Sequence, residues 1–298
     1  DIKQDAQTLQ AHALYLARFV EEYAAEGIEI RAVHPQNEPG WPQDYPSCGW
    51  PGDSMRDYFA QHLGPLFAQR LPGTEVWLGT MSNPTSDSIV RSVLGDPIAA
   101  SYVRGLGLQW GMERNARQYV DDYGLPTLQT EHRCGHYPWV EKEDPENYPD
   151  GAAFAPAPND HDYAVESWGL IKRWIDQGVN GYLAWNMVLD TDGYNLDEIR
   201  AWAQNSLLAV DREKRQLIVT PAYYVFRHVA QFVEPGAVLL DVGEADALAW
   251  KNADGSIVAV VHNPAGTAVE TVLAAGGRTW RFSTPARGWA TVVLRGII

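Results

Sequence analysis

Two glutamates of this sequence stand at the ends of short, apolar, strand-like runs. Glu38 follows the run 28–33 within the stretch His-Pro-Gln-Asn-Glu-Pro, and Glu131 ends the run 127–131. A carboxyl group at such a strand end is partly removed from water, which raises its pKa and suits a general acid. A second carboxylate nearby, held ionised by hydrogen bonds, can attack an anomeric carbon. Spacing alone leaves a plainer alternative open, in which both glutamates cap the helices that follow.

Alternating helix-like and strand-like segments surround these glutamates. The first helix is predicted to end at Gly27. It is indicated by apolar residues at helical spacing, namely Leu9, Ala13, Leu16, Val20 and Tyr23. Further helices are predicted over 54–70, 86–94, 114–122 and 163–177, and strands over 28–33, 76–80, 106–110, 127–131 and 181–187. This alternation predicts parallel βαβ units, with strand ends typical of the catalytic face of a TIM barrel.

The pattern changes after about residue 220. Six short strand candidates without intervening helices follow, at 238–242, 247–251, 257–261, 271–273, 280–282 and 291–294. Their spacing of roughly ten residues predicts an antiparallel β-sandwich. We therefore predict an α/β chain of two domains, in which residues 1–220 are the C-terminal part of a (β/α)8 barrel and residues 221–298 are a β-sandwich. The region 140–160, acidic and rich in proline, is predicted to be a long loop.

The barrel portion contains five predicted strands, whereas a closed barrel of this type has eight. A five-stranded fragment would expose a wide apolar edge. We therefore expect the first three strands in a segment that precedes residue 1, either as a separate or cleaved partner piece or as part of the same protein. On the same reasoning, the chain expressed alone is expected to be unstable.

The composition excludes several classes of protein. The 298 residues contain 23 Lys and Arg against 38 Asp and Glu, a net charge of −15, which disfavours binding to nucleic acid. No apolar run is long enough for a transmembrane helix. Residues 1–5 lack the features of a signal peptide. We favour a secreted or periplasmic location, on the expectation that the natural N-terminus lies upstream.

An ordered set of stretches resembles glycoside hydrolase family 30, the glucosylceramidase-like group of retaining (β/α)8 enzymes. They are Gln-Asn-Glu-Pro at 36–39, Tyr-Pro-Ser-Cys at 45–48, Leu-Gly-Pro at 63–65, Thr-Glu at 130–131, Trp-Asn at 185–186, Pro-Ala-Tyr-Tyr at 221–224 and Glu-Pro-Gly at 234–236. No single stretch is decisive, but their order and approximate spacing agree over roughly residues 5–295.

The resemblance implies a role for each matching residue. Glu38 corresponds to the acid/base and Glu131 to the nucleophile, and Asn37 would contact the 2-hydroxyl beside the scissile bond. Retention by double displacement requires the two carboxyl groups about 5–5.5 Å apart. Trp185 would form part of the floor of the glycone subsite, or else pack in the barrel, and Asn186 would bind a sugar hydroxyl.

Further aromatic and amide side chains are candidates for substrate binding. Gln109 and Trp110 stand where many relatives have a histidine followed by an aromatic residue. The neutral amide therefore leaves substrate preference and pH behaviour open. Trp41 and Tyr45 could stack on an aglycone sugar or pack their own loop.

Two cysteine and histidine patterns allow other interpretations. His132 and His136 flank Cys134, but no third metal ligand is evident, and we predict neither a metal nor a cofactor. Both histidines are expected instead to be loop residues that line the sugar cleft. Asp-Thr-Asp-Gly at 190–193 lacks the remaining ligands of a calcium loop and is predicted to be a turn. Cys48 and Cys134 follow the two glutamate-bearing strands, so a disulfide and two free thiols both remain open.

The resemblance thus implies a retaining β-glycoside hydrolase whose partner is a carbohydrate, either a β-glycoside, an oligosaccharide or a glycolipid. Glucosylceramide-like glucosides, β-1,6-glucan and β-xylosides all fit. A non-catalytic carbohydrate-binding relative is the alternative. The presence of both glutamates favours the enzyme.

Overall fold

The computed structural model describes residues 3–41, 47–134, 161–191 and 206–296. The chain divides into two compact units. The first unit comprises residues 1–132 and 173–184, and the second comprises residues 133–172 and 185–298. Among the described residues, no helix is both long enough and apolar enough to cross a membrane.

A five-stranded sheet forms the centre of the first unit. Its strands lie in chain order: β1 (Ala32–Val33), β2 (Glu75–Met81), β3 (Val103–Gln109), β4 (Thr127–Arg133) and β5 (Tyr182–Trp185). The first four strands pair in parallel, and the β3–β4 register places Gln109 beside Glu131. This half-barrel confirms the predicted fold class. The first predicted strand is shorter than expected, because only two of its residues pair with β2.

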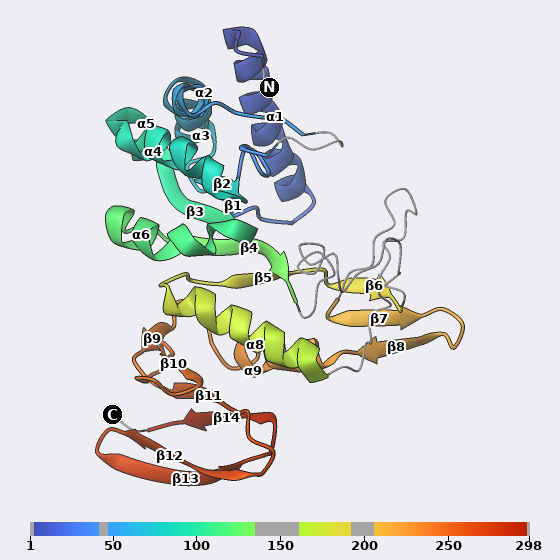
Figure 1. Ribbon diagram of the computed structural model, residues 1–298. Helices are drawn as coiled ribbons and strands as arrows, with labels where there is room; N and C mark the ends of the chain where they lie inside the picture. The colour runs from blue at the N-terminus through green and yellow to red at the C-terminus, as the bar shows by residue number, and fades with distance from the viewer. Residues whose placement is uncertain (1–2, 42–46, 135–160, 192–205, 297–298) are drawn as a thin grey trace. The chain divides into compact units, whose positions relative to one another are not determined.

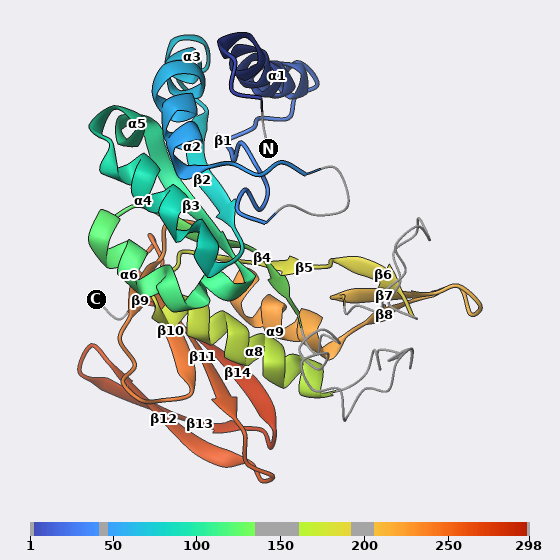
Figure 2. The ribbon, with the colours of Figure 1, turned by 45° about the horizontal axis from the view of Figure 1, so that its top comes forward.

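Helices pack along one side of this sheet (Figure 1, Figure 2). They are α1 (Ala6–Ala25), α2 (Gly52–Tyr58), α3 (Gly64–Arg70), α4 (Asp87–Gly95), α5 (Pro97–Tyr102) and α6 (Glu113–Tyr123). Leu9, Ala13 and Val20 of the predicted apolar stripe are buried, whereas Tyr23, at its C-terminal end, is exposed. The buried face of α1 joins a core that includes side chains from α2 to α6, β2 and β3. Helix α8 (His161–Asp176) begins in the second unit and ends in the first.

The helix predicted over 54–70 contains a turn of different geometry. A π-helical segment at Phe59–Leu63 separates α2 from α3, and the Gly64 N–H bonds to the Phe59 carbonyl. The reason is Pro65, which has no N–H to donate and disturbs the regular bonding pattern. Gly64 is required for packing here, because a Cβ at this position would lie 2.3 Å from the Tyr102 ring.

The second unit contains a small sheet that the sequence patterns did not predict. Strands β6 (Val188–Asp190) and β7 (Leu208–Asp211) pair in parallel, and β8 (Gln216–Val219) pairs antiparallel with β7. Helix α9 (Pro221–Ala230) follows, and its N-cap is Thr220. The predicted domain boundary between residues 220 and 221 lies at the start of α9. The boundary itself stays a prediction.

The predicted sandwich strands are all present in the second unit. Four of them form an antiparallel sheet in the order β14-β11-β10-β9: β9 (Val238–Leu240), β10 (Ala247–Lys251), β11 (Ile257–Asn263) and β14 (Gly288–Leu294). The other two, β12 (Val269–Ala275) and β13 (Arg278–Thr284), form a hairpin.

A hydrogen-bonded cluster attaches the first turns of α8 to this sandwich. Trp168 Nε1 donates to Asp246 Oδ1 at 2.6 Å, and Asp246 Oδ2 lies 2.7 Å from His262 Nδ1. The His262 ring stacks on Trp289, with 4.4 Å between ring centroids. Hydrogen bonds from Trp168 and His262 lower the Asp246 pKa against the opposing effect of burial.

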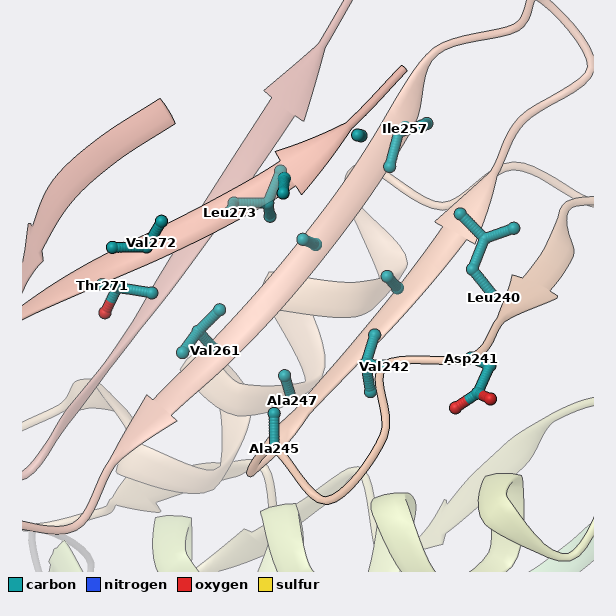
Figure 3. Close-up of a pocket in the computed structure, with 14 residues that line it drawn as sticks. Leu240, Asp241, Val242, Ala245, Ala247, Ile257, Val261, Thr271, Val272 and Leu273 are labelled. Atoms are coloured by element: carbon teal, nitrogen blue, oxygen red, sulfur yellow. The ribbon is translucent and has the colours of Figure 1, made fainter. Parts of the chain in front are cut away.

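A pocket of about 370 Å³ lies between β10, β11 and β12 (Figure 3). Its lining is mainly aliphatic, including Leu240, Ala247, Ala259, Val261 and Leu273. Asp241 is the single charged residue in the lining. The pocket therefore offers apolar surface rather than groups for chemistry.

Candidate active site

Four polar side chains meet where successive strands of the half-barrel end. Asn37 follows β1, Thr80 lies on β2, Gln109 is the last residue of β3, and Glu131 lies near the end of β4. Because the carboxyl ends of parallel barrel strands share one edge, residues far apart in sequence come together here. All four belong to the first unit.

Gln109 is the centre of the hydrogen-bond network that joins them. Its Nε2 lies 3.1 Å from Glu131 Oε2, 2.8 Å from Thr80 Oγ1 and 2.9 Å from Asn37 Oδ1. The Thr80 hydroxyl in turn donates to Asn37 Oδ1 at 2.8 Å. Gln109 is almost fully buried, so it acts from within the protein rather than from the surface.

The backbone of β2 holds the loop that carries Glu38. The Glu38 N–H donates to the Thr80 carbonyl at 2.9 Å, and the Thr80 N–H donates to the Gln36 carbonyl at 2.7 Å. Glu38 has a φ of +49°, an uncommon conformation for a residue with a side chain. Such conformations persist where surrounding contacts fix them, and they often occur at functional sites. Here the contacts from Thr80 fix Glu38 beside the network.

The two glutamates are electrostatically coupled. Burial is the main reason that the pKa of Glu131 rises from its ordinary value of 4.5 to about 7, and the nearby charge of Glu38 raises it further. Hydrogen bonds from Trp110 and Gln109 act in the opposite direction, because they stabilise the ionised carboxylate. At a pH below about 7 this site therefore holds a proton.

Aromatic rings surround His132, the residue that follows Glu131. Trp110 follows Gln109 directly and adopts a φ of +37°, and its ring centroid lies 5.0 Å from that of His132. His132 is 6% exposed and also contacts the rings of Trp174 and Tyr182. The sequence interpretation of His132 as a loop residue lining the cleft is therefore wrong, because it is a buried residue of β4.

The expectation of no metal at His132 and His136 stays a prediction. Among the described residues, no cluster of three or more His, Cys, Asp or Glu side chains is arranged to hold an ion. His136, Asp192 and Gly193 lie outside the described residues. Asp190 is part of β6, and its carboxylate lies 3.4 Å from Arg212.

Both cysteines are free thiols. Cys134 is fully buried in the second unit, where its Sγ donates to the Asn186 carbonyl at 3.6 Å. Burial raises the pKa of the Cys134 thiol to about 12. This thiol is therefore protonated and unreactive at neutral pH.

The remaining predicted binding residues are Trp41, Tyr45, Trp185 and Asn186. Trp41 is 52% exposed, and its backbone N–H donates to the Glu38 carbonyl at 2.9 Å. Tyr45, and the predicted loop 140–160, lie outside the described residues. Trp185 and Asn186 belong to the second unit, where the Asn186 carbonyl accepts a hydrogen bond from the Leu207 N–H at 3.1 Å.

The network also contains a residue that the sequence did not reveal. Thr80 was predicted only as the last residue of a strand, but it contacts Asn37 and Gln109 through its side chain and residues 36 and 38 through its backbone. The available signal was a polar residue at the end of an apolar strand.

Comparison with known protein families places this geometry in context. The model of the glycosyl hydrolase family 30 TIM-barrel domain matches residues 2–233. The chain belongs to glycosyl hydrolase family 30. The β-sandwich domain of the same family matches residues 236–292, which confirms the predicted resemblance and the second architecture.

Individual relatives show how far this family 30 chain has diverged. It is 25% identical to the lysosomal acid glucosylceramidase of Mus musculus, over 85% of this chain and 50% of that protein. It is 26% identical to an endo-1,6-β-D-glucanase of Neurospora crassa, over 90% of this chain and 55% of that protein. A solved endo-β-1,6-glucanase structure superposes with a TM-score of 0.80 at 21% identity, over 96% of this chain and 63% of that one. The chain spans about half the length of the curated relatives it matches.

Proposed function

We propose that this protein is a retaining β-glycoside hydrolase, with Glu131 as nucleophile and Glu38 as acid/base. The observation that supports this most is the coupled pair of glutamates at the strand ends, one of them anchored by Gln109. Family 30 membership supports glycoside hydrolysis as the reaction class. An inverting mechanism would instead need the carboxyl groups farther apart, with room for a water between them.

The proposed reaction has two steps. In the first, a Glu131 oxygen attacks the anomeric carbon while Glu38 donates its proton to the departing glycosidic oxygen, which gives a covalent glycosyl-enzyme ester and a free aglycone alcohol. In the second, Glu38 takes a proton from water, and the resulting hydroxide oxygen displaces Glu131. Two inversions at the anomeric carbon return the sugar with its original configuration.

The charges of the pair define what substrate binding has to achieve. Burial raises the pKa of Glu131, so this residue, which must attack as a carboxylate, is protonated more readily than an exposed glutamate. The hydrogen bonds from Gln109 and Trp110 oppose this and favour ionised Glu131. We propose that the bound substrate completes the transfer, because the glycosidic oxygen offers an acceptor for a proton on Glu38. The role assignment follows the family resemblance and is tested directly by the Glu38 variant discussed below.

The proposed substrate is a β-linked glycoside, with glucose as the favoured glycone. The names of the murine and fungal relatives, a glucosylceramidase and an endo-1,6-β-D-glucanase, motivate this choice. Asn37 would donate to the 2-hydroxyl, Trp185 and Asn186 would contact the glycone, and Trp110 would line the subsite. Trp41 and Tyr45 would meet the aglycone, where an exposed indole such as Trp41 suits stacking on a sugar.

The test is the configuration of the first product. Proton NMR during hydrolysis of an aryl β-glucoside or aryl β-xyloside should show the β-anomer first, followed by slow mutarotation. Early α-anomer would contradict the retaining mechanism. Binding of these glycosides without any hydrolysis would contradict the proposed activity and favour a carbohydrate-binding role.

A further inference from the structure

The Asn37 side chain is anchored through its carbonyl oxygen. Oδ1 accepts hydrogen bonds from the Thr80 hydroxyl and from Gln109 Nε2. Asn37 itself is exposed, whereas both partners are buried. Within the described part of the chain, Asn37 Nδ2 donates to no protein acceptor. The part of this amide that remains available to a ligand is therefore a hydrogen-bond donor.

The chemistry of the partners fixes this orientation. The Thr80 oxygen accepts a hydrogen bond from Gln109, so the Thr80 hydroxyl hydrogen is directed at Asn37 Oδ1. Turning the Asn37 amide over would place its NH₂ group against the NH₂ group of Gln109. Turning Gln109 over as well would place its carbonyl oxygen against the Glu131 carboxylate, and two acceptors would face each other. When Glu131 is ionised, its negative charge thus sets the direction of these hydrogen bonds as far as Asn37.

A buried orphan atom supports the same conclusion. Gln109 Oε1 is buried and has no hydrogen-bond partner. A buried carbonyl oxygen without a hydrogen-bond partner costs free energy. The orientation of the Gln109 amide therefore does not serve to give its own oxygen a hydrogen bond. The two hydrogens of its Nε2, shared among three acceptors, therefore outweigh that cost, which means that orientation of the neighbours is what this amide provides.

We propose that Thr80 and Gln109 are positioning residues that lock Asn37 with its Oδ1 toward the protein and its Nδ2 toward the substrate. The inference rests on the proposed function, in which Asn37 meets the hydroxyl next to the anomeric carbon. In this orientation the sugar hydroxyl acts as the acceptor. Neither positioning residue touches the sugar.

Thr80→Val tests the lock, because valine has a similar shape but neither donates nor accepts. The Thr80 backbone contacts to residues 36 and 38 remain in this variant. The protein expressed from its natural gene is assayed on an aryl β-glycoside and on its 2-deoxy analogue. We expect kcat/KM of Thr80→Val to fall about 10- to 100-fold on the 2-hydroxy substrate, as for loss of a buried polar contact, and less than about 3-fold on the 2-deoxy substrate.

Two control variants separate positioning from structural damage. Thr80→Ser retains the hydroxyl and should retain most of the activity on both substrates. Thr127→Val removes a buried hydroxyl of β4 that donates only to the Leu125 carbonyl, so its effect should not depend on the 2-hydroxyl. If Thr80→Val does not fold, Gln109→Met removes the other donor to Asn37 Oδ1 and should likewise affect the 2-hydroxy substrate more.

The outcomes are distinguishable. Selective loss on the 2-hydroxy substrate, with rescue by serine, supports the lock. Equal loss on both substrates, or loss on neither, overturns it while leaving the proposed function intact. A wild-type protein that hydrolyses neither substrate overturns the proposed function, and the positioning role falls with it.

Discussion

Replacement of Glu131 with glutamine is expected to lower kcat at least about 10⁴-fold on every substrate, natural or activated. Glutamine has nearly the same shape, but its amide oxygen is too weak a nucleophile to form a covalent glycosyl-enzyme. The Gln109 Nε2 donor that contacts Glu131 Oε2 can still bond to an amide oxygen at position 131. The loss would therefore be chemical rather than structural, and steady-state kinetics on an aryl β-glycoside measures it.

The same variant should be more stable than the wild type at neutral pH. The pKa of Glu131 is raised in the folded protein to about 7 from an ordinary 4.5, so folding favours its protonated form. This stabilisation is fully present below pH 4.5, declines as the pH rises, and is lost above about pH 7. Glu131→Gln does not titrate there, so its advantage in unfolding free energy should grow to at most about 3 kcal/mol across that range.

The control is Glu75→Gln. Glu75 is the first residue of β2, at the end of this strand away from Thr80, and its carboxylate accepts a hydrogen bond from the Trp77 indole at 2.7 Å. That variant should keep its activity. Urea unfolding at a series of pH values gives the stability comparison. Residual activity of Glu131→Gln near the wild-type level would remove Glu131 from the mechanism. A stability difference that does not change with pH would show that the buried carboxyl is not the cause.

Replacement of Glu38 with alanine should affect substrates according to their leaving groups. An alkyl or sugar leaving group must be protonated as it departs, so we expect kcat/KM to fall about 10²- to 10⁴-fold. A dinitrophenyl leaving group departs without a proton, so its glycosylation rate should remain near that of the wild type. Glu29→Ala, an exposed position before β1, is the matched control and should not distinguish the substrates.

Azide then discriminates between the two possible roles of Glu38. If Glu38 is the acid/base, azide enters the space left by alanine, attacks the glycosyl-enzyme and gives a β-glycosyl azide. If Glu38 is instead the nucleophile, azide attacks the substrate directly and gives the α-glycosyl azide. The configuration of the azide product therefore decides which glutamate is the nucleophile. Burial alone would suggest the opposite roles, because it raises the pKa of Glu131 and a raised pKa is typical of a general acid. Equal loss on all substrates, without rescue, would contradict an acid/base role.

The fold was predictable where one pattern extends over many residues. The apolar stripe of α1 and the alternating strands and helices gave the half-barrel, and the spacing of short strands gave the sandwich. The sheet of β6, β7 and β8 was not predicted, because its strands are three or four residues long and belong to no regular alternation. The π-helical segment was also missed, since its cause is a single residue, Pro65, within an otherwise helical pattern.

The site was predictable to the extent that strand ends carry its residues. Glu38 and Glu131 could be selected because each follows an apolar run, and the structure brings them to one edge of the sheet. The role of Thr80 could not be predicted, because it depends on the lateral pairing of β2 with its neighbours. Gln109 was expected to contact the substrate, but it is 1% exposed and bonds to other site residues. The burial of Gln109 depends on how β3 packs between β2 and β4. That packing cannot be read from the residues next to Gln109 in the sequence.

The central claim is that Glu131 forms a covalent bond with the sugar. The protein is incubated with a dinitrophenyl 2-deoxy-2-fluoro-β-glycoside, whose fluorine slows the second step so that the ester accumulates. Mass spectrometry of the intact protein and of its proteolytic peptides then locates the label. The account predicts one fluorosugar per chain, attached to Glu131 and absent from Glu131→Gln. A label on Glu38, or turnover of an active enzyme with no covalent adduct, would contradict it.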